Sequence, residues 1–234
     1  MAYPLDLVGK VAHFKVPGDG GPVIPSQIVN GTLTGRTSLE RVIVQSTANV
    51  LNNAAAVIPQ PPWSFTFLKY VPGYVTVAPL NGNLLTGPMS GCYIFKYTEG
   101  GSTMVAHVGT ANHETSELSV DAKNAWTAFA ARPEVSEIIG GKPDDYFKPG
   151  EIAAAMPQGS QILPQTCCYY DGMSFFSILL VPQPRNLGAN ALKVAGVKQM
   201  TMQPWDTIRV MRTFLITEAE DKVKDRKAFR LGST

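Results

Sequence analysis

The sequence is poor in the side chains that build metal centres and disulfide frameworks. It has three cysteines and three histidines in 234 residues, and it contains neither a CxxC nor an HExxH motif. Because metal sites need clustered ligands at short spacings, we expect no metal and no other cofactor. Cys167 and Cys168 are adjacent in the sequence. We interpret them as buried strand thiols of a protein that works in the reduced state.

Charged residues and long apolar runs are also scarce. Charged residues make up 16% of the chain and the net charge is +2, which is too small an excess to indicate a nucleic-acid partner. The longest apolar stretch, near residues 175–181, is too short to cross a bilayer. The first residues lack the basic and apolar regions of a secretory signal. The sequence therefore predicts no membrane span and no signal peptide.

Glycine and proline are plentiful instead, with 21 and 18 residues. This composition favours many short strands and turns over a helix bundle. We predict one α+β domain over residues 1–234, with a central, mainly antiparallel β-sheet or sandwich flanked by a few helices. Residues 218–234 carry mixed charge and are expected to form a helix or a tail.

Local patterns place the expected elements along this domain. Helices are expected at residues 46–57 and 119–131, the second with Ser119 as its N-cap and Pro133 after its end. Residues 133–160 have the composition of an irregular segment. We expect strands at residues 63–70, 74–78, 92–97, 103–108 and 206–216, a strand at 39–45, and a hairpin of residues 162–170 and 173–181.

The most informative stretch is Thr86-Gly87-Pro88-Met89-Ser90-Gly91-Cys92, with His107 in the next apolar run, 15 positions after the cysteine. A thiol needs a base or a cation beside it to react at neutral pH, and imidazole is the usual partner. The glycines and the proline predict a tight turn before Cys92. Main-chain N–H groups of Ser90 and Gly91 in that turn could serve as an oxyanion hole.

The two apolar runs are separated by a glycine-rich turn and are expected to form a hairpin. A turn centred on Glu99-Gly100 places Cys92 opposite His107, and a turn centred on Gly100-Gly101 makes the two residues diagonal neighbours on one face. A three-residue loop would place them on opposite faces. Two of the three alignments therefore bring the thiol and the imidazole together.

Ser90-Gly91-Cys92 with His107 downstream resembles the catalytic signature of the cytotoxic necrotizing factor deamidase domain. It is also similar to the Burkholderia lethal factor toxin, in which a Leu-Ser-Gly-Cys motif follows a threonine. Met89 replaces that leucine here, and Thr86 lies six residues before Cys92. Bacterial chemoreceptor deamidases are more distantly similar. The resemblance covers residues 84–110, and it favours a β-sandwich.

The resemblance implies that the chain deamidates a glutamine on a protein substrate. Cys92 would attack the carboxamide, His107 would move the protons, and water would hydrolyse the γ-glutamyl thioester to glutamate. Thr86 would orient His107 through its carbonyl or its hydroxyl. With an amine in place of water, the site would perform transglutamination. Such a protein would be a bacterial toxin or effector, made in the bacterial cytoplasm and acting in the host-cell cytosol.

Two other functions remain open from the residues alone. The first is a Cys–His peptidase or amidase, although papain-like enzymes place their histidine much farther downstream. The second is a non-catalytic β-rich binding protein in which Cys92 is simply packed. His113 is interpreted as an exposed loop residue, and Trp63, Trp126 and Trp205 as core residues.

Overall fold

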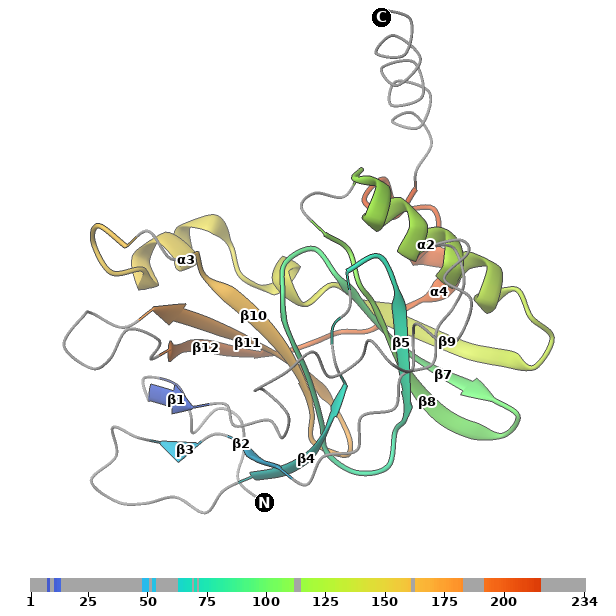
Figure 1. Ribbon diagram of the computed structural model, residues 1–234, viewed down its shortest axis with the longest axis horizontal. Coiled ribbons are helices and arrows are strands. Elements are labelled where there is room, and N and C mark those ends of the chain that lie inside the picture. Colours follow the sequence, from blue (N-terminus) through green and yellow to red (C-terminus); the bar gives the residue numbers. More distant parts are fainter. Residues whose placement is uncertain are drawn as a thin grey trace, which may run out of the picture.

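Two β-sheets make up most of the described structure (Figure 1). The computed structural model describes residues 8, 11–13, 48–50, 52–53, 63–68, 70, 72–111, 115–160, 163–182 and 192–215. The first sheet has eight strands in the order β2 (Ala48–Val50), β4 (Trp63–Leu68), β6 (Leu84–Met89), β10 (Gln165–Tyr170), β11 (Phe175–Pro182), β12 (Leu192–Gln199), β1 (Val11–His13) and β3 (Asn52–Asn53).

The second sheet has five strands and carries the predicted motif hairpin. Its order is β13 (Gln203–Pro204), β9 (Val135–Gly141), β7 (Tyr93–Glu99), β8 (Ser102–Val108) and β5 (Val75–Pro79). Among the described strands, β4 and β6 pair in parallel and the other pairs are antiparallel. The helices are α2 (Glu117–Ala130), the 3₁₀ turn η2 (Pro143–Tyr146), α3 (Pro149–Ala155) and α4 (Trp205–Ile208). The predicted α+β class with a mainly antiparallel sheet is confirmed.

Helix α2 covers one face of the five-stranded sheet, as Figure 1 shows. Side chains alternate along β7, so Tyr93, Phe95 and Tyr97 point toward this helix. The rings of Phe95 and Trp126 stack with centroids 4.5 Å apart. Full burial of each large side chain contributes roughly 1.5–3 kcal/mol. This aromatic core holds β7, and with it the preceding turn, in a fixed position.

The opposite face of the five-stranded sheet contributes to a second core with the eight-stranded sheet. Ile94 of β7 and Val105 of β8 pack there with residues from β4, β6, β10 and β11. The members are Leu68, Ala78, Leu80, Leu84, Met89, Cys92, Ile94, Val105, Cys168, Tyr170, Phe175 and Met200. Side chains of β6 and β8 that point inward therefore meet in the layer between the two sheets.

Several predicted strands are confirmed, and one helix has a different N-cap. Strands β4, β5, β7 and β8 and the β10–β11 hairpin lie where the sequence places them. Helix α2 begins earlier than expected, because Ser116 is the N-cap and accepts a hydrogen bond from Ser119 N. Ser119 is buried inside the first turn, and its hydroxyl donates to the Ala111 carbonyl at 3.0 Å. The prediction of Ser119 as N-cap is wrong.

Three other predicted elements are wrong, each for a tertiary reason. Residues 133–160 are not irregular, because β9 pairs with β7 and η2 and α3 follow it. Where they are described, residues 206–215 continue α4 and form turns instead of the strand expected at 206–216, and Phe214 packs into the aromatic core. The helix expected at 46–57 is wrong where β2 and β3 are described. The strand at 39–45, the tail 218–234 and the side chain of Trp63 lie outside the described residues.

Candidate functional site

Thr86 and His107 meet in the layer between the two sheets. Thr86 lies on β6 and His107 on β8, and both are fully buried. The Thr86 hydroxyl oxygen and His107 Nδ1 are 2.6 Å apart, which is a hydrogen bond between the sheets. The contact is made by the side chain of Thr86, which answers the question that the sequence left open between its hydroxyl and its carbonyl.

A bulge in β6 accompanies this placement of Thr86. The pairing with β10 shifts register between Thr86 and Met89, so the chain gains a residue just after the threonine. Gly87 occupies the bulge with φ +129°. A Cβ there would lie 3.0 Å from Cys167 Sγ and 3.1 Å from the Thr166 carbonyl. Only glycine fits this position without a shift of β10, which explains why the motif contains it.

Cys92 lies where the chain passes from β6 to β7, and thus from one sheet to the other. The β7–β8 hairpin pairs Ile94 with His107 and turns at Gly100-Gly101. This is the second of the two predicted registers. Cys92, two residues before Ile94, is therefore a diagonal neighbour of His107 on the same face, at a backbone separation of roughly 7–8 Å. The predicted register is confirmed, and among the described residues the Cys92 thiol contacts Thr110 instead of His107.

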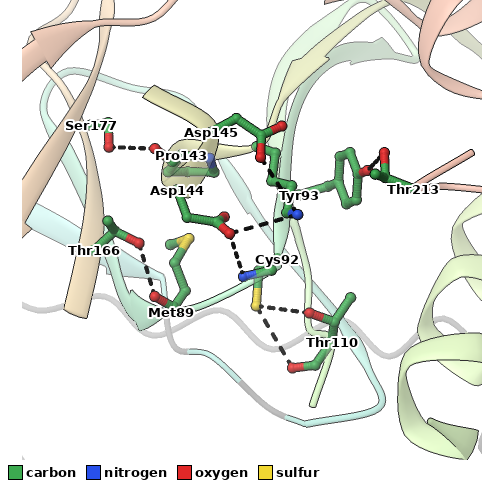
Figure 2. A network of polar contacts seen from close by, with 12 residues as sticks. Met89, Cys92, Tyr93, Thr110, Pro143, Asp144, Asp145, Thr166, Ser177 and Thr213 are labelled. Carbon is green, nitrogen blue, oxygen red and sulfur yellow. Dashed lines mark hydrogen bonds and ion pairs between the residues drawn. The ribbon is translucent and has the colours of Figure 1, made fainter. Parts of the chain in front are cut away.

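The thiol of Cys92 contacts Thr110 in this conformation (Figure 2). Its Sγ donates to the Thr110 carbonyl at 3.8 Å and accepts from the Thr110 hydroxyl at 3.6 Å. Burial raises the pKa of Cys92 to about 11; contacts with Thr110 and the Ser90 main chain oppose this rise, and the charge of Asp144 adds to it. Cys92 is therefore a protonated thiol at neutral pH.

Among the described residues, His107 has a hydrogen-bond partner at only one of its two ring nitrogens. Burial lowers the pKa of His107 to about 3, so the ring is neutral at physiological pH. Nδ1 faces Thr86, and within the described residues Nε2 has no hydrogen-bond partner. A hydroxyl can donate or accept, so either tautomer satisfies the Thr86 contact. Only the tautomer with the proton on Nδ1 leaves Nε2 with the lone pair that a general base needs.

Tyr70, which the sequence did not single out, lies against His107 and Thr110. Its hydroxyl donates to the Thr110 carbonyl at 2.7 Å, the same carbonyl that Cys92 contacts. Its ring centroid lies 5.4 Å from that of His107. Burial, with the nearby Cys92 as a smaller cause, raises the pKa of Tyr70 to about 12. A tyrosine at a strand end carries no sequence signal for such a role.

Asp144 on η2 is a second residue that the sequence missed, because its segment has the composition of an irregular loop. Its Oδ2 accepts the Gly91 main-chain N–H at 3.0 Å and lies 3.6 Å from Lys142 Nζ. Burial raises the pKa of Asp144, while Lys142 and the hydrogen bond from Gly91 oppose the rise. Figure 2 shows Asp144 and Thr110 on opposite sides of Cys92. The Gly91 N–H is therefore occupied by Asp144 in this conformation.

A cavity of about 280 Å³ lies beside the turn that precedes Cys92. Tyr70 and Thr110 form part of its wall, and Ser90 is exposed at its edge. Cys92 itself is only 1% exposed and does not line the cavity, but it contacts the lining residue Thr110. The remaining lining residues are Pro88, Met89, Ala111, Leu163, Pro164 and Gln165.

The described residues contain no group of three or more His, Cys, Asp and Glu side chains that could hold a metal ion. His113 lies outside them. Where the structure is described, no helix has the length and apolar character needed to cross a membrane. No protein-family model, no curated protein and no solved structure matches this chain.

Proposed function

We propose that the protein is a cysteine-dependent protein-glutamine deamidase. The observation that carries the proposal is the hydrogen bond between Thr86 and His107, in the same layer as Cys92. Thiol catalysis needs a nucleophile, a base within reach and a third group that fixes the imidazole tautomer. The resemblance of Ser90-Gly91-Cys92 and His107 to glutamine-deamidating toxins supplies the substrate class.

The reaction starts with a rotation of the Cys92 side chain from Thr110 toward His107 Nε2. The thiol proton moves to Nε2 as the sulfur attacks the glutamine carboxamide. Burial opposes a charge on either group alone, as the raised pKa of Cys92 and the lowered pKa of His107 indicate. Transfer of one proton between them creates a contact ion pair without net charge, and the mutual attraction of the two ions offsets part of their desolvation.

The imidazolium then protonates the amide nitrogen of the tetrahedral intermediate, the C–N bond breaks, ammonia leaves, and a γ-glutamyl thioester remains on Cys92. Water, deprotonated by His107, hydrolyses the thioester and yields glutamate. A primary amine in place of water would give transglutamination. Thr86 acts as a positioning residue, since it holds Nδ1 and thereby directs Nε2 toward the sulfur. Substrate access requires a movement that exposes the thiol, because Cys92 is buried and contacts Thr110.

The test compares the wild type with Cys92→Ser on proteins of a eukaryotic cell lysate. Peptide mass spectrometry should reveal a glutamine converted to glutamate by the wild type and left intact by the variant. His107→Ala should also abolish the conversion while the variant keeps its fold by circular dichroism. If new chain termini appeared instead of glutamate, the protein would be a peptidase.

One observation favours a second candidate, a non-catalytic β-rich binding protein. Cys92 is 1% exposed and contacts Thr110 instead of a base. In that case the thiol would be a packing residue. Cys92→Ser and Cys92→Ala would then leave every activity of the protein unchanged, and no glutamine would be converted in any lysate.

A further inference from the structure

The groups around Cys92 have a common electrostatic character. The Thr110 carbonyl and hydroxyl face the sulfur on one side. The carboxylate of Asp144 raises the pKa of the thiol from the other side. Lys142 is 3.6 Å from Asp144 Oδ2 and balances part of its charge. Among the described residues, no cationic side chain contacts Cys92 itself, so its surroundings are acceptor-rich and partly negative.

The cavity that Thr110 lines has a similar electrostatic character. Its described lining consists of Tyr70, Ser90, Thr110, Gln165 and apolar residues, without a charged side chain. A carboxylate that enters such a cavity loses part of its hydration and meets no cation among the described lining residues, which is costly. A carboxamide of the same shape carries no charge, and its NH₂ group offers two donors.

We propose that this cavity selects a carboxamide over a carboxylate, with the Thr110 carbonyl as the acceptor for the amide N–H and Asp144 as the group that repels a carboxylate. The substrate identity rests on the proposed function, whereas the charge selection is a property of the cavity. When Cys92 turns toward His107, its weak contact with the Thr110 carbonyl breaks. The lone pair set free can accept an N–H of the substrate, so binding and activation of the thiol are coupled.

The same arrangement gives the reaction a direction. Glutamine enters as an uncharged group and is held through its NH₂. Hydrolysis replaces that donor with a carboxylate, which offers nothing to the Thr110 carbonyl and is repelled by the charge that Asp144 places near the sulfur. The product is therefore expelled, and glutamate in the target protein does not compete with glutamine. Thr110 and Asp144 are thus specificity-determining residues, and neither belongs to the sequence motif.

Two alkylating agents of matched shape test this selection without any protein substrate. Iodoacetamide carries a carboxamide and iodoacetate a carboxylate. In both reactions the Cys92 sulfur forms a bond to the methylene carbon, iodide leaves with the electron pair of the broken bond, and the thiol proton passes to His107 or water. Rates are followed on the peptide that contains Cys92 by mass spectrometry, which separates it from the deeply buried Cys167 and Cys168.

The readout is the ratio of the iodoacetamide rate to the iodoacetate rate. It is divided by the same ratio for N-acetylcysteine amide, an uncharged thiol, so that the thiolate fraction and the intrinsic reagent reactivities cancel. We expect the ratio for the wild type to exceed that of the small thiol by about tenfold, which is a difference of about 1.4 kcal/mol. Asp144→Asn should lower it several-fold, since asparagine still accepts the Gly91 N–H but carries no charge.

Asp145→Asn is the matched control. Asp145 is adjacent in sequence and also lies 3.6 Å from Lys142, but its side chain is 61% exposed. Its substitution should leave the ratio unchanged. The proposal would be overturned if Asp144→Asn had an intact melting curve and an unchanged ratio. It would also be overturned if the wild-type ratio equalled that of the small thiol, or if neither reagent labelled Cys92. Selective labelling without deamidation would leave the cavity assignment and remove the proposed function. Deamidation without selective labelling would leave the proposed function and overturn the assignment of the cavity.

Discussion

Substitution of Thr86 separates the positioning of His107 from the packing of the layer between the sheets. Thr86→Val keeps the shape of the side chain and removes the hydroxyl that lies 2.6 Å from His107 Nδ1. His107 is fully buried, so Nδ1 loses its partner and cannot recruit water. A buried polar group left without a partner costs about 1–3 kcal/mol. For a chain of this length, the melting temperature should fall by about 3–10 °C.

Thr86→Ser is the matched variant, because it keeps the hydroxyl and loses one buried methyl group. That deletion costs about 1 kcal/mol, so the serine variant is also destabilised. The two variants should differ far more in activity than in stability. Loss of imidazole orientation should lower the rate of Thr86→Val by about 10²-fold, whereas Thr86→Ser should stay within about tenfold of the wild type.

The measurement combines melting curves with the rate of glutamine conversion. A double-mutant cycle with His107→Ala isolates the contact, and the coupling between the two positions should be about 1–2 kcal/mol. If Thr86→Val retained the activity of Thr86→Ser, the hydroxyl would not position His107. A coupling energy near zero would show that the contact contributes nothing to stability.

Two further predictions concern the pH dependence of stability and the bulge in β6. Burial lowers the pKa of His107 in the folded protein to about 3. Below the ordinary pKa of histidine, this side chain therefore binds a proton in the unfolded chain but not in the folded protein. The free energy of unfolding should therefore fall as the pH drops from about 6.5 toward 3, by up to about 1.4 kcal/mol per pH unit. Urea unfolding measured at several pH values should show that His107→Gln lacks this contribution to the pH dependence. Gly87→Ala should destabilise the protein more than Gly82→Ala in the same assay, since both glycines have positive φ but only Gly87 has close neighbours. Equal losses would mean that contact with Cys167 is unimportant.

The sequence predicted the core of the candidate site because local patterns determine it. Alternating apolar residues and the Gly100-Gly101 turn define the β7–β8 hairpin, and the hairpin register places Cys92 diagonally from His107 on the same face. Side-chain alternation also determines that both face the same layer. For these residues, local structure and tertiary structure agree.

The rest of the site depends on contacts between segments that are distant in sequence. Thr86 reaches His107 only because β6 and β8 belong to different sheets that face each other. Asp144 comes from a segment whose composition indicates an irregular loop, and its position depends on the pairing of β9 with β7. Tyr70 lies after β4, and its contact with Thr110 spans 40 positions. No local pattern records such contacts.

The same dependence explains the elements that were predicted wrongly. Residues 206–216 alternate like a strand, but Trp205, Ile208 and Phe214 pack into the aromatic core as a short helix and turns. The segment around Ala48–Val50 has a helix-like composition, yet it pairs with Trp63–Phe65 of β4. In both cases tertiary packing outweighs local propensity.

The most direct test of the account is to capture the acyl intermediate on Cys92. Wild-type protein is mixed with a protein that it deamidates, quenched in acid within one turnover, and digested for peptide mass spectrometry. We expect a γ-glutamyl thioester that joins the Cys92 peptide to the side chain of the converted glutamine, and we expect no such adduct in Cys92→Ser. An adduct through a main-chain carbonyl, or glutamate formation without any adduct on Cys92, would contradict it.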